Sequence, residues 1–394
     1  MPSSYLIAGC RTPIGKFLGG LAPLSAPQLG AVAIAEAVRR AAVPLDEVDE
    51  VIFGNVVSAG VGQAPARQAA LFAGLPPSVA AVTVNKVCGS GLKAVMLADQ
   101  AIRAGDSHLI IAGGMESMSR APHLLLNTRA GWKYGNQTAV DALIHDGLWC
   151  PFENVAMGSE ADYIAASRGV SREDQDAFAV ESHRRATVAW QQGFFRDEIV
   201  AVKVPVGKGR DTILERDEGP RPDSSLQTLQ KLSPAFAPNG TVTAGNASQL
   251  SDGAAAVVVA SESVAKCYPS ALTARIVATA TGGVPPKEIF IAPVVAMEKV
   301  LAKAQLTLAE IDLIELNEAF AAQCLACLRP LKLDPEKVNV HGGAIALGHP
   351  IGASGARVLV TLLHALQQRN LRRGLAALCL GGGNAVAMIV ERCE

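Results

Sequence analysis

Net charge, aromatic residues and long apolar runs are all scarce in this sequence. Its 394 residues include 35 basic and 36 acidic side chains. A net charge of −1 lacks the strong basic field of a nucleic-acid-binding protein, so we expect no nucleic-acid partner. Phe, Trp and Tyr make up only 4% of the chain, which argues against an aromatic platform for sugars or bases. An anionic ligand must therefore be held by a few placed groups.

The chain also lacks the segments that mark secreted or membrane proteins. No stretch reaches the roughly 18 consecutive apolar residues of a membrane span, and the nearest, 375–390, is broken by 381–384 (GGGN). Residues 1–10 show neither a secretory signal nor an Arg-rich transit peptide, and 391–394 are no peroxisomal address. Eight cysteines in so long and apolar a chain do not suggest a disulfide scaffold. The sequence predicts a cytoplasmic protein with reduced thiols and no membrane contact.

Short apolar runs alternate with helical patterns along the chain. The runs predict strands at 5–8, 48–56, 79–87 and 108–112. Helical spacing predicts helices over 27–42, with Ser25 as N-cap, and over 89–104, ended by Gly105. This alternation predicts an α/β protein with a mostly parallel sheet covered by helices.

The last third of the chain repeats the order of the first. Residues 47–52 (EVDEVI) resemble 310–315 (EIDLIE), and Ser90-Gly91 opens one predicted helix as Ser354-Gly355 opens another, at nearly the same offset. We therefore expect two copies of one α/β unit that fuse in the interior. The alternative is chance similarity among segments rich in Ala, Val and Gly.

A segment of different character, from about 116 to 244, separates the two copies. It carries all three tryptophans and most of the local charge. Residues 171–174 (SRED) resemble a capping box, which predicts a helix that runs to Gln192. Residues 206–223 are charged and rich in Gly and Pro, which predicts an exposed loop. We expect an inserted cover over a site on the core, where substrate contacts are often found.

Cys88 lies between a predicted strand and a predicted helix start. Free backbone N–H groups and the helix dipole favour an anion there. We therefore expect the pKa of the Cys88 thiol to fall from about 8.5 toward about 3.5–7.5. Local context leaves two interpretations open, a reactive nucleophile and a buried structural cysteine.

Three more residues lie at predicted element ends. His349, in the Gly-rich run 341–355, stands near the place that Cys88 holds in the first copy. It can take a thiol proton and hold an oxyanion, or simply cap a turn. Cys379 precedes the triplet 381–383 and can supply a base beside a backbone donor, or mark a bulge. Asn317 follows a predicted strand, either as the N-cap of a helix or as the holder of a water at the reaction centre.

No metal site is expected. Cys324 and Cys327 form a C-x-x-C pair inside a predicted helix with no second pair, and the remaining histidines lack metal-ligand spacing. The sequence contains no phosphate-binding loop or dinucleotide motif.

Together these segments resemble the thiolase family over essentially the whole chain. The motifs that carry the resemblance are NKVCGSG (85–91), GGMESMS (113–119), NEAF (317–320), GHPIG (348–352) and CLGGG (379–383). The resemblance implies an α/β thiolase fold, in which duplicated βαβαβαββ halves form a layered α/β/α/β/α core with an inserted loop domain. It implies an N-terminal half at 1–116 plus 245–270, a coenzyme A-binding loop domain at 117–244, and a C-terminal half at 271–394.

The resemblance also implies the reaction of two acetyl-CoA to acetoacetyl-CoA and coenzyme A. Cys88 would accept the acyl group, His349 would take its proton, and Cys379 would remove the α-proton of acetyl-CoA. His349 and a water on Asn317 would hold the enolate oxygen, and the N–H groups of Cys88 and Gly381 would hold the acyl carbonyl. The expected partners are acyl-CoA substrates and copies of the chain, in a homodimer or a dimer-of-dimers tetramer. Coenzyme A would be substrate and product, with no permanently bound cofactor and no metal.

The resemblance places the coenzyme A contacts at Leu148, Met157, Arg221, Phe236, Ala244 and Ser248. Arg221 offers charge and a flat surface for adenine, but it can equally be a solvated loop residue, and Phe236 and Met157 can be core residues. The sequence departs from the family at Ala156, which is His in many biosynthetic members, and at 289–293 (IFIAP), which is Met-Gly-Thr-Gly-Pro in acetoacetyl-type members.

Three alternatives to this activity remain at this point. The first is a degradative 3-ketoacyl-CoA thiolase of longer chain specificity. The second is a non-catalytic acyl-CoA-binding protein of the same fold. The third is a decarboxylative condensing enzyme, which Cys379 argues against because such sites lack a base in that role.

Overall fold

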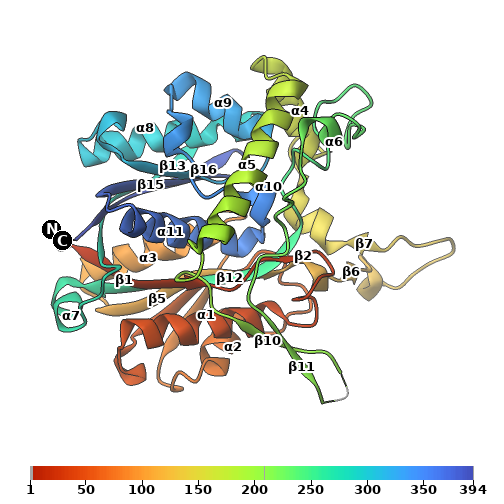
Figure 1. Ribbon diagram of the computed structural model, residues 1–394. Coiled ribbons are helices and arrows are strands. Elements are labelled where there is room, and N and C mark those ends of the chain that lie inside the picture. Colours follow the sequence, from red (N-terminus) through yellow and green to blue (C-terminus); the bar gives the residue numbers. More distant parts are fainter. Residues whose placement is uncertain (1–2, 208, 394) are drawn as a thin grey trace.

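The computed structural model describes residues 3–207 and 209–393 (Figure 1). Ten strands form one hydrogen-bonded sheet in the order β14-β15-β16-β13-β1-β12-β5-β3-β4, with β2 paired to β12 beside that path. The strands are β1 (Ser4–Arg11), β2 (Gly15–Lys16), β3 (Glu50–Gly54), β4 (Ala80–Val84), β5 (Leu109–Ser117), β12 (Ser251–Ser261), β13 (Ala274–Gly283), β14 (Leu313–Leu316), β15 (Arg373–Leu380) and β16 (Asn384–Arg392). The predicted domain limits at 1 and 394, and residue 208 of the predicted loop 206–223, lie outside the described residues.

Both halves of this path have the same strand order. In the N-terminal half β4, β3, β5, β12 and β1 are neighbours in turn, and in the C-terminal half β14, β15, β16 and β13 follow the same scheme. A parallel bridge between Ile314 and Val338 takes the place beside β14 that β4 takes beside β3. The halves join where β1 pairs with β13 through Tyr5–Arg275 and Leu6–Ala274. The predicted duplication of one α/β unit is confirmed.

The prediction of a mostly parallel sheet is wrong. Among the described strands, parallel pairing occurs only between β3 and β4, β3 and β5, and β14 and β15. By contrast, β12 runs antiparallel to β1 and β5, and β16 runs antiparallel to β13 and β15. The reason is the connection that precedes the last strand of each half. A tight turn joins β15 to β16, and the inserted segment joins β5 to β12, so no simple crossover helix forces these neighbours to be parallel.

Helices cover the sheet in three layers (Figure 1). α3 (Ser90–Ala104) and α11 (Ile351–Gln368) lie between the two halves and pack on each other. α1 (Ala26–Ala41) and α2 (Pro65–Phe72) cover the outer face of the N-terminal half, while α8 (Ala292–Ala304) and α9 (Ala321–Leu331) cover that of the C-terminal half. One apolar cluster fills the central interface and one fills each outer interface. This is the α/β/α/β/α arrangement that the resemblance implied.

The two central helices approach closely because glycines face each other's backbone. A Cβ on Gly91 of α3 would lie 2.7 Å from the backbone nitrogen of Ala356, and one on Gly355 of α11 would strike the backbone nitrogen of Leu92. Side chains on α11 are buried on all sides from Ile351 to Leu366, which explains its apolar composition around the whole circumference.

Two helix starts predicted from the sequence are confirmed. Ser25 caps α1, and its side chain and that of Gln28 form a capping box. Ser171 does the same with Asp174 at the start of α5 (Arg172–Gln192), which ends at Gln192 as predicted. Gly105, with a positive φ of 86°, ends α3.

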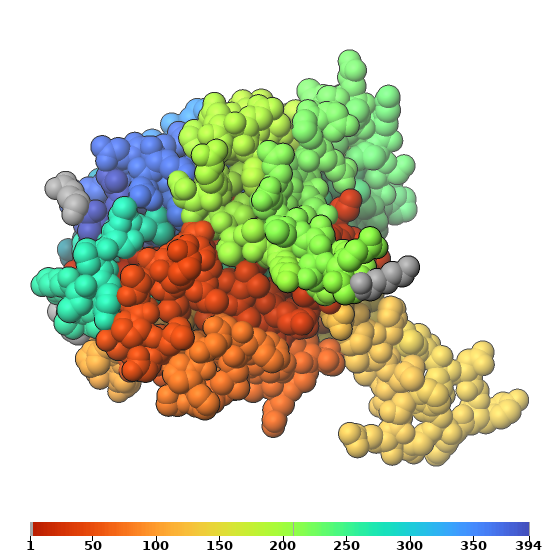
Figure 2. Space-filling model, turned by 60° about the horizontal axis from the view of Figure 1, so that its bottom comes forward, coloured from red at the N-terminus to blue at the C-terminus, as the bar shows by residue number. Residues whose placement is uncertain are grey.

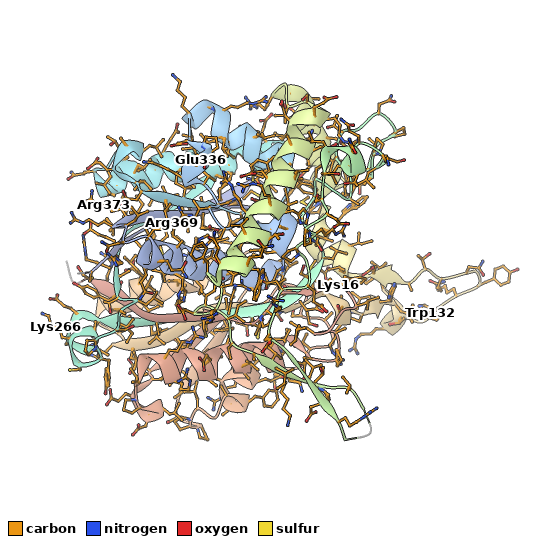
Figure 3. The ribbon with its side chains drawn as sticks, viewed as in Figure 1. Lys16, Trp132, Lys266, Glu336, Arg369 and Arg373 are labelled. Carbon is orange, nitrogen blue, oxygen red and sulfur yellow. The ribbon has the colours of Figure 1, made fainter. Side chains whose placement is uncertain are left out.

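The segment between the halves adds helices and short hairpins. Its elements are β6 (His123–Leu124), β7 (Val140–Asp141), β8 (Trp149–Cys150), β9 (Val155–Ala156), α4 (Met157–Ser167), α5, β10 (Val202–Pro205), β11 (Asp211–Leu214) and α6 (Leu226–Leu229). The β6–β7 hairpin projects from the body (Figures 1 and 2), and Trp132 lies on the projection (Figure 3). The remaining helices are α7 (Glu262–Cys267) and α10 (Ala344–Leu347). No helix of the described chain is long and apolar enough to cross a membrane.

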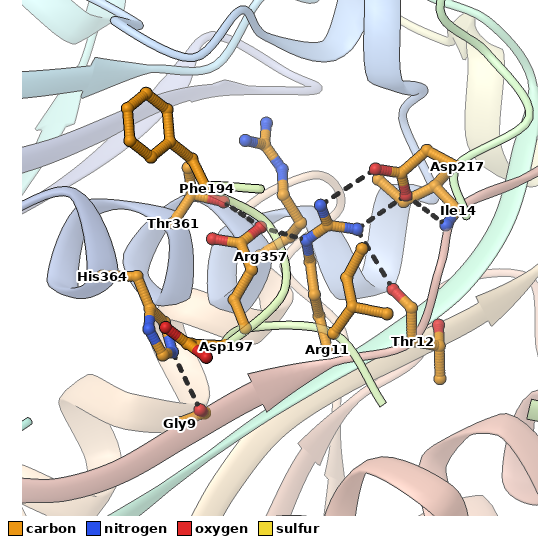
Figure 4. A network of polar contacts seen from close by, with 12 residues as sticks. Gly9, Arg11, Thr12, Ile14, Phe194, Asp197, Asp217, Arg357, Thr361 and His364 are labelled. Carbon is orange, nitrogen blue, oxygen red and sulfur yellow. Dashed lines mark hydrogen bonds and ion pairs between the residues drawn. The ribbon is translucent and has the colours of Figure 1, made fainter. Parts of the chain in front are cut away.

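The predicted loop 206–223 is only partly an exposed loop. Its described part includes β11, which forms an antiparallel hairpin with β10. The turn between the two strands belongs to the predicted loop, but β11 itself is a strand. Beyond this hairpin, Asp217 turns inward to the buried Arg11 (Figure 4). Arg11 Nη1 and Nη2 donate to the two Asp217 oxygens at 2.7 and 3.0 Å, and Arg11 Nε donates to Glu198 Oε1 at 2.5 Å. The ion pairs tie the inserted segment to β1.

Candidate active site

A cavity of about 490 Å³ opens among the two halves and the inserted segment. Cys88, His349, Cys379 and Gly381 all line it, although they come from different parts of the chain. The structure therefore brings together four of the five residues predicted to act in chemistry. The other wall residues are mostly apolar.

Cys88 is held in a tight loop between β4 and α3. Ser90 Oγ donates to the Val87 carbonyl at 2.7 Å and accepts from the Lys86 N–H at 2.8 Å. Asn85 Oδ1 accepts from the Val87 N–H at 3.0 Å. Val87 has a φ of 47°, an uncommon conformation for a β-branched residue, and these bonds maintain it. The loop thus presents Cys88 at the start of α3, as the sequence predicted.

The predicted fall of the Cys88 pKa is wrong. Burial disfavours the thiolate and raises the pKa of Cys88 to about 12, and the nearby carboxylate of Glu116 acts in the same direction. Hydrogen bonds from the N–H groups of Cys88 and Gly381 to the sulfur lower the pKa but do not outweigh burial. Cys88 is therefore a neutral thiol at rest and needs a base to become a nucleophile.

His349 is arranged to be that base. Ser354 Oγ donates its hydrogen to the Pro350 carbonyl at 2.9 Å and lies 2.6 Å from His349 Nδ1. Ser354 has only one hydrogen, and with that hydrogen on the Pro350 carbonyl we assign the imidazole proton to Nδ1, which leaves a lone pair on Nε2. Nε2 is buried and has no partner within the described part of the chain. Burial lowers the pKa of His349 to about 3, so the ring is neutral at rest.

Cys379 stands at the end of β15 on the other side of the cavity. It is 2% exposed, and burial raises its pKa well above the ordinary value, with further contributions from Cys88 and Cys327 nearby. The turn from β15 to β16 follows at once, with positive φ values of 81° at Gly382 and 83° at Gly383. This turn brings the Gly381 N–H to the Cys88 sulfur.

Asn317 is not the N-cap of a helix. α9 begins only at Ala321, because the loop before it is tied to another segment: Ser248 N–H donates to the Ala319 carbonyl and Ala321 N–H to the Asn246 carbonyl. The Asn317 side chain is fully buried, and neither its oxygen nor its nitrogen has a partner in residues 3–207 and 209–393. Buried amides are normally satisfied, so this one fits a bound water or ligand atom. Asn317 does not itself line the cavity, but Ala319 and Phe320 do.

Five of the six predicted coenzyme A contacts line the same cavity. They are Leu148, Met157, Phe236, Ala244 and Ser248. Arg221 does not: it lies on an exposed stretch, where its backbone N–H donates to His183 Nδ1 at 3.1 Å. Arg221 follows the hairpin of the inserted segment, and a single sequence carries no signal of which way such a loop faces.

Sequence reasoning missed two features of the site. Phe290 and Phe320 line the cavity and meet edge to face at 5.3 Å between ring centroids. Glu116 is a fully buried carboxylate at the end of β5. A carboxylate inside an apolar strand is the signal that points to Glu116. Among the described residues, no group of three or more His, Cys, Asp or Glu side chains is placed to hold a metal ion.

Comparisons with known proteins agree with this architecture. The family described as "Thiolase, N-terminal domain" matches residues 4–263, and "Thiolase, C-terminal domain" matches residues 270–392. The "Acetyl-CoA acetyltransferase" of Escherichia coli (strain K12) is 52% identical over 393 residues and all of both chains, and that of Cupriavidus necator is 50% identical over 392 residues and all of both. The crystal structure of the Bacillus anthracis acetyl-CoA acetyltransferase matches with a TM-score of 0.97 at 40% identity, covering 100% of this chain and 99% of that one. The chain therefore belongs to the thiolase family.

Proposed function

We propose that the protein is an acetyl-CoA C-acetyltransferase, which interconverts two acetyl-CoA with acetoacetyl-CoA and coenzyme A. The observation that carries the proposal is the convergence of Cys88, His349, Cys379 and the Gly381 N–H on one apolar cavity. The relatives of about 50% identity that bear this enzyme's name support it.

In the first half-reaction Cys88 takes the acetyl group from acetyl-CoA. His349 Nε2 accepts the thiol proton while the sulfur attacks the thioester carbonyl, and the same proton then goes to the departing coenzyme A sulfur. The N–H groups of Cys88 and Gly381, which meet at the Cys88 sulfur, can hold the carbonyl oxygen as it gains charge. Loss of one such donor typically costs about 3–4 kcal/mol of transition-state stabilisation.

In the second half-reaction a carbon–carbon bond forms. Burial raises the pKa of Cys379, so its resting thiol must first give its proton to His349, and the thiolate that forms is a strong base. This thiolate removes an α-proton from a second acetyl-CoA, and the enolate carbon attacks the acetyl group on Cys88. The Cys88 sulfur leaves as a thiolate and takes the proton back from His349, so both cysteines end as thiols. We assign the enolate oxygen to His349 and to a water on Asn317, whose buried amide has no partner among the described residues.

Aromatic rings line the cavity near Cys379. Phe320 packs edge to face on both Phe290 and Phe236, at 5.3 and 6.3 Å between ring centroids, and Cys379 belongs to the same apolar cluster as Phe290 and Phe320. The preference for acetyl transfer over the longer-chain alternative is supported by the relatives that bear the name acetyl-CoA acetyltransferase.

Several further assignments belong to the same proposal. We divide the chain into a loop domain at 117–244 and two halves, at 1–116 plus 245–270 and at 271–394. We place coenzyme A against Leu148, Met157, Phe236 and Ala244 of the loop domain and against Ser248 of the N-terminal half. Both cysteines must act as free thiols, and all eight cysteines of the chain are free, which supports a reducing cytoplasmic compartment.

We also propose a homodimer that pairs further into a tetramer. β4 ends the sheet path, its edge is unpaired within the described chain, and Val82 on it is 42% exposed. Such an edge is a template for a strand of a second copy. The projecting β6–β7 hairpin exposes Leu125, Leu126 and Trp132, which supports a second contact. Light scattering coupled to size exclusion distinguishes monomer, dimer and tetramer.

The test of the activity is thiolysis of acetoacetyl-CoA by coenzyme A, followed by the loss of enolate absorbance, with Cys88→Ser as the control. Intact-mass spectrometry after acetoacetyl-CoA should show an acetyl adduct that Cys88→Ser lacks. No turnover with substrates from C4 to C16 would remove the enzyme assignment, and binding without an adduct would favour a non-catalytic protein. Faster turnover of C8 to C16 than of C4 would favour the longer-chain thiolase.

A further inference from the structure

Glu116 is a buried carboxylate to which the proposed mechanism gives no role. Its side chain is fully buried, and no Lys or Arg of the described chain compensates its charge. Instead its oxygens accept hydrogen bonds from two separate segments. Oε1 accepts from Asn55 Nδ2 at 2.8 Å and from the Val57 N–H at 3.3 Å, and Oε2 accepts from the Val56 N–H at 3.1 Å and the Gly352 N–H at 2.9 Å.

The bond to Gly352 acts on the helix that follows His349. Gly352 lies in the first turn of α11, whose N–H groups have no partner inside the helix. A carboxylate there satisfies one of them and matches the positive end of the helix dipole. The fit is tight, because a Cβ on Gly352 would lie 2.6 Å from the Met115 carbonyl oxygen and 2.8 Å from Glu116 Oε2. Since His349 precedes Gly352 by three residues, this anchor fixes the turn that carries the imidazole.

The bonds to Val56 and Val57 act on the neighbourhood of Cys88. These two residues form an apolar cluster with Ile351, against which Cys88 packs. The Val56 carbonyl also accepts from Asn85 Nδ2 at 3.4 Å, in the loop that carries Cys88. Glu116 therefore links the loop beside the thiol to the helix behind the imidazole.

The duplication of the fold shows that this link is specific to one half. β5 and β15 hold the same place in the strand order of their halves. Counted from the start of each strand, Glu116 in β5 corresponds to Leu380 in β15. Leu380 lies against Gly89 at the start of α3, where Glu116 lies against Gly352 at the start of α11. One half makes this contact apolar and the other makes it ionic.

We propose that Glu116 is a positioning residue, whose carboxylate holds the first turn of α11 against the loop 55–57 and so sets His349 at working distance from Cys88. The inference rests on the proposed function for its effect on the rate, and on the structure alone for its effect on α11. A displacement of about 1 Å at a reacting group can cost about 100-fold in rate.

The experiment compares Glu116→Gln and Glu116→Asp with the wild type. In the Gln variant an NH2 group replaces one oxygen, so it must face at least one N–H donor. In the Asp variant the charge remains but the carboxylate is one methylene shorter. We expect each to lower kcat for acetoacetyl-CoA thiolysis about 10- to 100-fold with KM changed far less. We also expect faster amide hydrogen exchange in peptides that cover 351–356.

Alkylation of Cys88 by iodoacetamide separates the effect of the Glu116 charge from the effect of the Glu116 side-chain length. Burial raises the pKa of Glu116 itself to about 7, so the comparison is made at about pH 9, where its carboxylate is charged. That charge raises the pKa of the Cys88 thiol, so at this pH Glu116→Gln should react faster, while Glu116→Asp should react as the wild type does. If Glu116 only stabilised the fold, the two variants would not differ in their rates of Cys88 alkylation in this way. The Asp variant also decides the question should the Gln variant not fold.

Asp252→Asn is the matched control. Asp252 is fully buried on β12, the strand next to β5, but its carboxylate accepts from Ser119 N–H and Oγ at 2.9 and 2.5 Å and not from α11. We expect exchange in 351–356 to be unchanged in this variant.

Unchanged exchange at 351–356 in both Glu116 variants would overturn the inference, as would an equal loss of kcat in Asp252→Asn. A wild-type protein without turnover would instead refute the proposed function. The exchange and alkylation measurements would still decide the role of Glu116.

Discussion

Replacing Cys379 by serine should separate the two half-reactions. The exchange keeps the side chain small, so the cavity wall made with Phe290 and Phe320 stays in place. What changes is the base, because a serine hydroxyl gives up its proton far less readily than a thiol. A positioned general base contributes about 100- to 10,000-fold to a rate. At about 1.4 kcal/mol per factor of ten, carbon–carbon bond formation should lose about 2.8–5.6 kcal/mol of transition-state stabilisation.

Acylation of Cys88 does not use Cys379 and should survive. His349 Nε2 remains free, and the N–H groups of Cys88 and Gly381 are backbone atoms that the exchange does not touch. Quenched-flow mass spectrometry with acetyl-CoA should therefore show an acetyl adduct formed at near the wild-type rate. Formation of acetoacetyl-CoA, followed by enolate absorbance, should fall by the factor above.

The structure also sets the control for this variant. Cys379 is 2% exposed, so the new hydroxyl is buried, and an unsatisfied hydroxyl costs about 1–3 kcal/mol of stability. Thermal unfolding therefore has to show that the variant is folded at the assay temperature. Equal loss of acylation and condensation in a folded variant would refute the division of roles between Cys88 and Cys379.

Three other outcomes follow from the buried groups. Arg11→Met leaves the carboxylates of Glu198 and Asp217 without their cation, and urea unfolding should show a loss of about 3–5 kcal/mol; a loss below about 1 kcal/mol would contradict the role of this ion pair. Because burial raises the pKa of Cys88 to about 12, its alkylation rate should climb about tenfold per pH unit between about pH 7 and 10, and a plateau below pH 9 would show a lower pKa. Asn317→Ala should lower kcat about 100- to 1,000-fold with little change in KM, and a KM effect alone would place Asn317 in substrate binding instead.

Local sequence predicted the helices well because their signals are local. A serine three residues before a polar side chain marks a helix start wherever the rest of the chain lies, as Ser25 and Ser171 show. The internal repeat was equally informative. It placed Cys88 and His349 at corresponding helix starts, and the two side chains line one cavity.

The sequence could not reveal what depends on distant neighbours. Strand direction follows from connections of very different length, so the antiparallel β12 and β16 were missed. The pKa of Cys88 depends on burial among residues distant in the sequence, and this burial outweighs the effect of the helix start that local context suggested. Asn317 has the residue type of an N-cap, but bonds from the loop 246–248 delay the helix.

The close approach of α3 and α11 at Gly91 and Gly355 affects how a substrate can enter the cavity. At this crossing point backbone rests on backbone, so α3 and α11 cannot move closer together, and the apolar side chains packed on either side of it hold the two helices in register. The two helices therefore form a rigid centre of the molecule. Entry and release of so large a molecule as coenzyme A must then depend on movement of the inserted segment 117–244. Substitutions that stiffen this segment should slow turnover without changing the packing of α3 on α11.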